Sequence, residues 1–125
     1  MTRFDPGTPN EIGPRKRPVH NMTPTLVCKN GVAVAAFGGQ GGRKIPSGVA
    51  DCLLGYVAEG LSLVDALRAP RLHTIGDLQV QIEGSVEEVN WLRDAGFEVS
   101  EAPGYARISA AQYDPTTGAC VGASA

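Results

Sequence analysis

The sequence predicts a mixed α/β domain of the α+β kind, in which antiparallel strands pack against helices. Two apolar runs flank Lys29-Asn30-Gly31, and Asn-Gly between apolar runs is typical of a tight hairpin. After a glycine cluster, apolar residues recur at helical spacing. Further on, Leu78, Val80 and Ile82 alternate with polar residues, which indicates a strand with one buried face.

The chain begins with a segment that has no apolar periodicity. Residues 1–21 are rich in proline, so we expect an extended arm there and an α/β part over residues 22–125. The hairpin strands are expected at 25–28 and 32–37, followed by a glycine loop at 38–42.

Two helices are expected after the glycine loop. Pro46 suits a first helical turn, because its missing N–H loses no hydrogen bond there. The apolar residues at helical spacing end at Gly60, which can stop the helix; they are Val49, Cys52, Leu53 and Tyr56. Ser62 and Asp65 then resemble a capping box for a short helix that ends before Pro70.

The sequence of the last third of the chain predicts four more strands and one helix. A strand is expected over 78–83, a helix capped by Ser85 and Glu88 ends at Gly96, and a short strand follows at 97–100. Strands at 107–113 and 119–121 flank a hairpin loop that contains Asp114 and Pro115.

Size and charge limit the classes of function. The 125 residues are 42% hydrophobic and carry a formal net charge of -2, which suits one globular domain or part of one. This balance argues against a nucleic-acid partner, which would require a clustered cationic face. The single basic run, residues 15–17, is interpreted as a solvated loop. No apolar run approaches the roughly 18 residues that span a bilayer, and the first residues lack the pattern of an export signal, so no membrane partner is expected and localisation is left open.

Cysteine and histidine spacing predicts no metal or cofactor. Cys28, Cys52 and Cys120 lack C-x-x-C spacing and lie in apolar segments, so we expect buried free thiols. His20 and His73 stand without a nearby Cys, Asp or Glu at metal-ligand spacing. No G-x-S-x-G signature is present, so these residues alone form no complete active site.

The glycine loop leaves three interpretations open. A tight structural turn is favoured, because glycine accepts backbone conformations that other residues avoid. A loop between a strand and a helix can also bind an anion or oxyanion through its N–H groups. Nucleotide binding is the weakest interpretation, because Arg43 and Ile45 break the phosphate-loop pattern and G-x-G-x-x-G is absent.

Four motifs give the chain a specific resemblance. The arm matches "P-N-S-x-x-P-x-K-R-P" at Pro9-Asn10, Pro14 and Lys16-Arg17-Pro18, with Glu11 at the serine position. Residues 20–25 match "S-S-M-x-P-T" in all but its first two positions. Gly38, Gly41-Gly42 and Ile45 match "G-x-x-G-G-x-x-I", and residues 66–73 match "A-x-x-A-P-R-x-H". Together these segments resemble the small subunit of gamma-glutamyltranspeptidases, over practically the whole chain.

The resemblance implies a fold and a chemistry. The fold is the four-layer αββα sandwich of N-terminal nucleophile hydrolases, whose precursor cleaves itself to expose a catalytic threonine. Met1 matches an internal methionine of the family's "M-D-D-F" segment, so we expect the threonine, the leading part of the small subunit and the large subunit to lie outside this sequence. Thr2 and Thr8 do not occupy the nucleophile's motif.

The resemblance also assigns roles to individual residues. Gly41 and Gly42 match the glycines whose N–H groups form the oxyanion hole. His20 and Asn21 replace the serine pair that binds a glutamyl α-carboxylate, and Arg3 replaces an aspartate that pairs with the α-ammonium group. These substitutions favour a substrate without the zwitterionic head of a glutamyl group.

We therefore expect the C-terminal part of a gamma-glutamyltransferase or glutathione hydrolase, acting on a small-molecule amide and inactive by itself. The alternatives are a non-catalytic α/β binding or assembly module and a related amidohydrolase for a non-glutamyl acidic amide.

Overall fold

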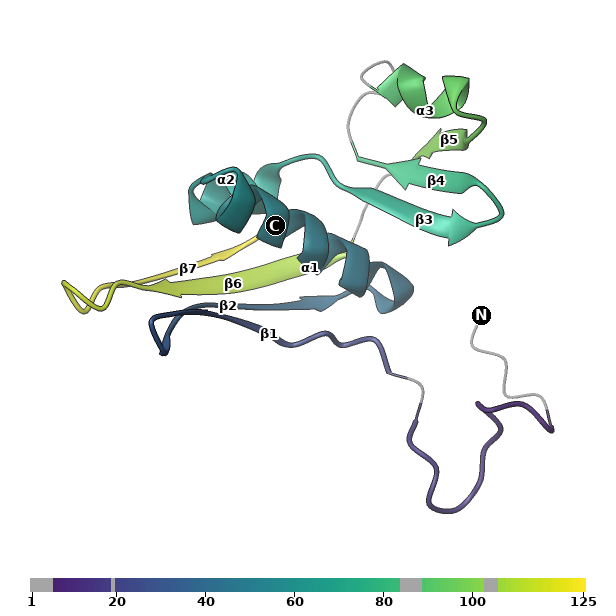
Figure 1. The fold of residues 1–125 in the computed structure, drawn as a ribbon, viewed down its shortest axis with the longest axis horizontal. Coiled ribbons are helices and arrows are strands. Elements are labelled where there is room, and N and C mark those ends of the chain that lie inside the picture. Colours follow the sequence, from purple (N-terminus) through teal and green to yellow (C-terminus); the bar gives the residue numbers. More distant parts are fainter. Residues whose placement is uncertain (1–5, 19, 84–88, 103–105) are drawn as a thin grey trace.

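A computed structural model of the chain describes residues 6–18, 20–83, 89–102 and 106–125. A four-stranded sheet with helices on one face forms the main body, and a three-stranded sheet stands beside it (Figure 1). The predicted mixed α+β class is confirmed.

The main sheet is antiparallel and has the strand order β1-β2-β6-β7. Its strands are β1 (Thr25–Lys29), β2 (Val32–Gln40), β6 (Arg107–Tyr113) and β7 (Cys120–Ser124). Both predicted hairpins are confirmed. Asn30 and Gly31 have φ angles of 52° and 80°, the left-handed geometry that a two-residue hairpin turn requires. β2 continues to Gln40, so Gly38 and Gly39 belong to the strand and the loop is shorter than the sequence predicts.

The helical layer follows β2 directly. A 3₁₀ turn, η1 (Gly42–Lys44), leads into α1 (Ile45–Leu53), with Pro46 in its first turn as predicted. The helix widens into a π-helical turn, η2 (Leu54–Ala58), where the amide of Glu59 donates to the Leu54 carbonyl at 3.1 Å. α2 (Leu63–Arg68) follows, and Ser62 Oγ accepts from the Asp65 amide at its start, which confirms the predicted cap.

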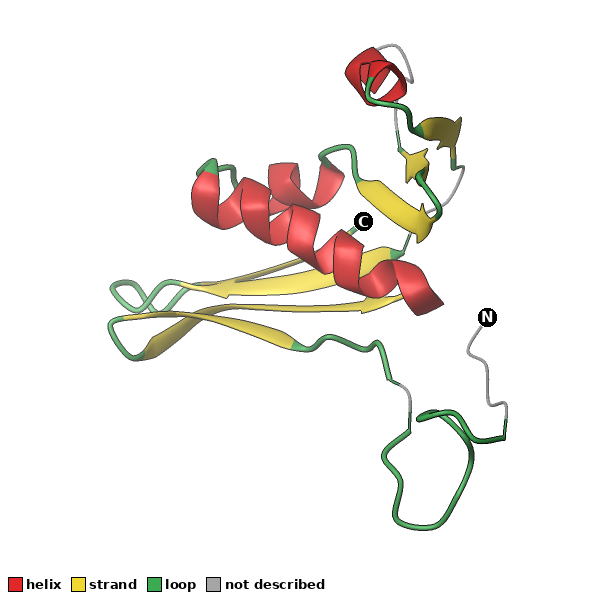
Figure 2. Cartoon of the chain, turned by 45° about the vertical axis from the view of Figure 1, so that its right-hand side comes forward, coloured by secondary structure: helices red, strands yellow, loops and turns green. Residues whose placement is uncertain are grey.

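The main core lies between this layer and one face of the sheet (Figure 2). Phe37 of β2 and Ile108 of β6 pack toward the helices, from which Val49 and Leu67 point back. Burial of each such large side chain stabilises the fold by about 1.5–3 kcal/mol. The described part of the chain places no helix on the opposite face, so the main body has one helical layer and one sheet layer.

The smaller sheet has the order β3-β4-β5, with β3 (Leu72–Gly76), β4 (Gln79–Ile82) and β5 (Glu98–Glu101). Strands β4 and β5 are parallel, whereas the sequence predicted antiparallel strands. The helix α3 (Asn90–Asp94) lies between them in the chain, and Leu92 of that helix packs on Val80 and Ile82. The N-terminal caps predicted at Ser85 and Glu88 lie outside the described residues.

Three sequence expectations are wrong in detail. Strand β3 was not expected, because its hairpin turn is Asp77-Leu78 rather than Asn-Gly; both residues have positive φ, 51° and 60°. Leu78 is therefore an exposed turn residue and not part of the buried strand face. Cys28 and Cys120 are exposed at the rim of the main sheet, so only Cys52 is a buried thiol.

The described residues before β1 form neither helix nor strand. The basic run, residues 15–17, is exposed as predicted, and Lys16 Nζ lies 3.8 Å from Glu11 Oε2. No helix in the described part of the chain has both the length and the hydropathy needed to cross a membrane.

Candidate functional site

The two loop glycines are required for different physical reasons. Gly41, directly after β2, has φ 144°, and a Cβ there would lie 2.6 Å from Ala106 Cα. Gly42 has φ 63°, yet a Cβ there would meet nothing within 4 Å. Steric contact with Ala106 and unusual φ thus demand glycine at 41, whereas backbone conformation alone favours it at 42.

Two cationic residues directly follow the glycines. Arg43 and Lys44 belong to η1, and the first turns of η1 and α1 contain no acidic residue. Gly41 and Gly42 are exposed, and the Lys44 amide donates to the Gly41 carbonyl at 3.4 Å. Exposed glycines between a strand and a helix N-terminus can approach an anionic oxygen closely.

An ion pair between buried Arg71 and half-buried Glu83 lies beside the loop. The Arg71 guanidinium, 6% exposed, donates from Nε and Nη2 to the two Glu83 oxygens at 2.6 and 3.0 Å. Its Nη1 donates to the Ala106 carbonyl at 2.7 Å. Because Ala106 contacts Gly41, Arg71 is connected to the loop through one residue.

His73 joins β3 to the first turn of α1. Its Nδ1 lies 2.7 Å from Ser47 Oγ, and Ser47 Oγ also donates to the Lys44 carbonyl at 3.2 Å. Burial, with the nearby charges of Lys44 and Arg43, lowers the pKa of His73 below its ordinary value, while Asp51 opposes the shift. The imidazole is thus held in its neutral form next to the cationic turn.

Two further titratable groups of α1 face this region. Asp51 Oδ2 accepts from the Leu72 amide at 2.9 Å, and burial raises the pKa of the Asp51 carboxyl against that bond and the charge of Arg71. Burial likewise raises the pKa of the Cys52 thiol. A thiol with a raised pKa has little thiolate at neutral pH, so Cys52 is suited to packing rather than to nucleophilic attack.

The residues predicted to bind substrate are placed only in part. His20 and Asn21 precede β1, and since Thr25 pairs with Phe37 in an antiparallel ladder, they leave the sheet at the end where the glycine loop lies (Figure 1). Their hydrogen bonds are local: His20 Nδ1 accepts from the Met22 amide, and the Asn21 carbonyl accepts from Thr23 Oγ1. Arg3 lies outside the described residues.

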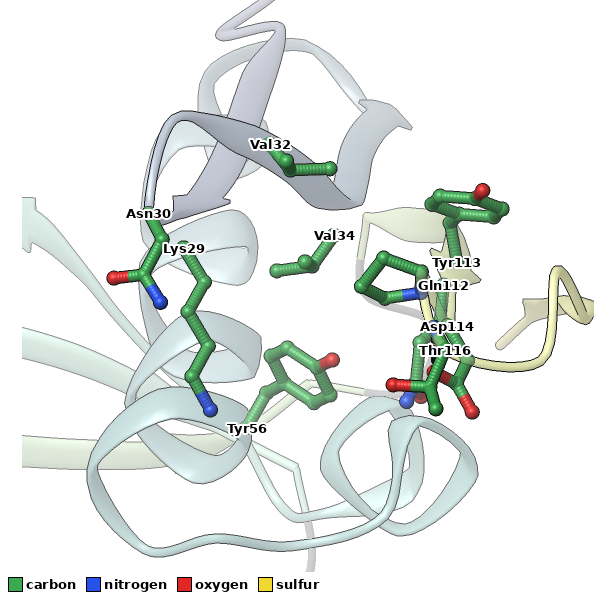
Figure 3. Close-up of a pocket in the computed structure, with 10 residues that line it drawn as sticks. Lys29, Asn30, Val32, Val34, Tyr56, Gln112, Tyr113, Asp114 and Thr116 are labelled. Carbon is green, nitrogen blue, oxygen red and sulfur yellow. Dashed lines mark hydrogen bonds between the residues drawn. The ribbon is translucent and has the colours of Figure 1, made fainter.

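Two hollows mark opposite ends of β2. A shallow one of about 280 Å³ adjoins the glycine loop, and it is lined by Gly38, Gly39, Gln40, Arg107 and Ser109. At the other end, a pocket of about 530 Å³ lies between the hairpin turns, with Lys29, Tyr56 and Thr116 around it (Figure 3). The larger pocket is a whole strand away from the glycines, so we place the candidate site at the smaller hollow.

Sequence reasoning missed Ala106 as a neighbour of the loop and Glu83 as the partner of Arg71. Arg71 and His73 had entered only as motif matches without a role. Burial of Arg71 has a physical requirement, because a buried guanidinium needs a carboxylate and further acceptors. The identity of those acceptors depends on β3 and on the chain's return into β6, which no local pattern indicates.

Comparison with known proteins gives the family. The gamma-glutamyltranspeptidase family model matches residues 1–125. A glutathione hydrolase proenzyme of Bacillus subtilis is 40% identical over 76 residues, which make up 59% of this chain and 13% of that protein. The chain thus spans a small part of the length of this relative.

Solved structures agree with this match. The gamma-glutamyltranspeptidase of Helicobacter pylori superposes with a TM-score of 0.80 at 25% identity, covering 97% of this chain and 73% of that chain. A cephalosporin acylase from Bacillus halodurans superposes with a TM-score of 0.85 at 30% identity, covering 94% of this chain and 23% of that one. From the family match over its whole length and these shared folds, the chain belongs to the gamma-glutamyltranspeptidase family.

Proposed function

We propose that the chain is the C-terminal portion of the small subunit of an amide hydrolase or acyltransferase of this family, and that Gly41 and Gly42 supply its oxyanion hole. The observation that supports the proposal is the loop itself: two exposed glycines with positive φ stand between the end of β2 and a helix N-terminus flanked by cations. Backbone N–H groups in such a place stabilise a developing oxyanion without reorganisation.

The reaction needs a nucleophile from outside these residues. In the proposed enzyme, a threonine hydroxyl attacks the amide carbonyl, its own α-amine takes the proton, and the carbonyl oxygen becomes an oxyanion facing the glycines. As the tetrahedral intermediate collapses, the α-ammonium group returns the proton to the leaving nitrogen, which departs as an amine and leaves an acyl-enzyme. Water or an amino-acid acceptor then resolves the acyl-enzyme. The large subunit and the leading part of the small subunit are the partners that this scheme requires.

The oxyanion assignment predicts the effect of a bulky residue at the loop. In the whole enzyme that contains this sequence, we expect Gly42→Val to lower kcat about 100- to 1,000-fold, because one N–H donor is displaced from the transition state. Gly60→Val is the matched control, since Gly60 also has positive φ, 71°, and open surroundings, but follows η2. Steady-state kinetics on folded protein, checked by circular dichroism, give the answer. An unchanged kcat in Gly42→Val would refute the role.

A second proposal concerns the substrate. Arg3 replaces an acidic partner of an α-ammonium group, and His20 and Asn21 replace two small hydroxyl residues, so the site favours an acyl group that ends in a carboxylate without an ammonium group. The similarity to a cephalosporin acylase is consistent with a non-glutamyl acyl group.

The substrate proposal is tested by comparing kcat/KM for two anilides. We expect kcat/KM of the whole enzyme to be at least about tenfold higher for glutaryl p-nitroanilide than for γ-glutamyl p-nitroanilide, because the two differ only in the ammonium group that a cation repels. Arg3→Asp should shift the ratio toward the γ-glutamyl compound. A wild-type preference for γ-glutamyl p-nitroanilide and for glutathione would contradict the proposal.

A further inference from the structure

We propose that Arg71 is a positioning residue for the oxyanion loop, which it holds in place through the carbonyl group of Ala106. The proposal rests on the proposed function of Gly41 and Gly42, and it adds a residue that touches neither the substrate nor the loop directly.

The guanidinium of Arg71 is fixed in both position and plane. Its two bonds to Glu83 form a bidentate pair, the geometry that constrains a guanidinium most strongly. The Glu83 amide also donates to the Arg71 carbonyl at 2.9 Å, so backbone and side-chain bonds both close the base of the β3–β4 hairpin. A further bond, from Nη1, is directed at the carbonyl oxygen of Ala106.

Ala106 transmits this position to the loop. It is fully buried, and its Cα and Cβ would lie 2.6 and 2.7 Å from a Cβ on Gly41, so the two residues are packed without space between them. The β2–β6 ladder ends at the pair Gln40↔Arg107. Gly41 and Ala106 therefore lie just beyond the last ladder pair, where the Arg71 bond fixes Ala106 relative to the base of the β3–β4 hairpin.

Small movements at this place affect catalysis. An oxyanion hole needs its donors about 2.7–3.1 Å from the reacting oxygen, and a misplacement of about 1 Å can lower a rate about 100-fold. Lysine at position 71 would keep the charge near Glu83, but its single ammonium group cannot reproduce three planar bonds. Ala106 would then be free to move away from Gly41.

We therefore expect Arg71→Lys in the whole enzyme to lower kcat about 10- to 100-fold with KM changed less than about twofold, because the ground state does not use the oxyanion donors. The substrate is whichever of glutaryl and γ-glutamyl p-nitroanilide the wild type hydrolyses faster. Affinity for the boronic-acid analogue of that substrate, whose tetrahedral adduct places an oxygen at the loop, should fall by the same factor. Affinity for the carboxylic-acid product should not.

Two other variants complete the design. Glu83→Gln keeps the Arg71–Ala106 bond but weakens the anchor, so its loss of kcat should lie between those of wild type and Arg71→Lys. Arg68→Lys is the matched control, because Arg68 is an exposed residue at the end of α2. It should change neither kcat nor boronate affinity.

Hydrogen–deuterium exchange of the segment 39–44 provides a readout independent of activity. We expect faster exchange in Arg71→Lys than in wild type or Arg68→Lys. Unchanged exchange and unchanged kcat in folded Arg71→Lys would overturn the positioning role, as would a lower melting temperature with wild-type kcat and boronate affinity. If the wild type hydrolyses neither anilide but exchange is still faster in Arg71→Lys, the result would support the role of Arg71 in positioning the loop and would refute the proposed function.

Discussion

At the scale of single residues, the protonation of His73 makes the stability of the fold depend on pH. Its pKa is lowered in the folded chain by burial and by the cations Lys44 and Arg43, so the unfolded chain binds a proton at higher pH than the folded chain does. The contribution of His73 to the free energy of unfolding should then be fully present above the unfolded pKa, near 6.5, and should be lost as the pH drops from there through the lower folded value.

His73→Asn tests this dependence. Asparagine keeps a polar atom close to the position of Nδ1 beside Ser47 but does not titrate, so the fall in stability between pH 7 and pH 5 should be smaller in this variant. Asp51, whose raised pKa changes stability in the opposite direction, interacts with His73, so the comparison measures His73 together with its coupling to Asp51. Urea unfolding at several pH values measures how steeply the free energy of unfolding changes with pH. His20→Asn is the control, because His20 is exposed. Identical slopes in wild type and His73→Asn would show that His73 does not contribute.

At the scale of elements, the sequence was most informative where turn chemistry and hydrophobic period agreed. The Asn30-Gly31 hairpin, the helix that begins near Pro46 and the Ser62 cap are all confirmed, because each depends on residues within a few positions of one another. The sequence does not predict the hairpin β3–β4, because Asp77 and Leu78 both adopt left-handed backbone conformations and the pair is not a typical turn sequence such as Asn-Gly. The tertiary contacts of Val80 and Ile82 outweigh the free-energy cost of the left-handed conformations at Asp77 and Leu78.

The candidate site likewise has a part that the sequence predicts and a part that it does not. Glycines after a strand and before a proline-started helix are visible in the sequence, so the loop at Gly41 and Gly42 was found. Its support was not, because the Arg71 bond to Ala106 joins residues 35 positions apart through a strand that local patterns did not predict. The ion pair with Glu83 depends on the same strand.

At the scale of the whole molecule, the main sheet has one face covered by helices and one face without a described cover. The uncovered face carries Leu26, 67% exposed, and small residues such as Ala36 and Ala111, a flat surface suited to packing against another sheet. Its outer strands, β1 and β7, also present exposed Cys28, Cys120 and Val121. Apolar surface and open strand edges together favour association with further chains.

We therefore expect the 125-residue chain, purified alone under reducing conditions, to self-associate and to release no p-nitroaniline from γ-glutamyl p-nitroanilide, since the proposed nucleophile is not among its residues. Sedimentation velocity should show species larger than 13.0 kDa.

Leu26→Glu places a charge on the uncovered face and should shift the distribution toward monomer. Leu54→Glu is the matched control, because Leu54 is similarly exposed, 59%, but lies on the helical layer. Equal effects of the two substitutions would show that association is not directed by the uncovered face, and robust turnover by the isolated chain would contradict the assignment of the nucleophile to another segment.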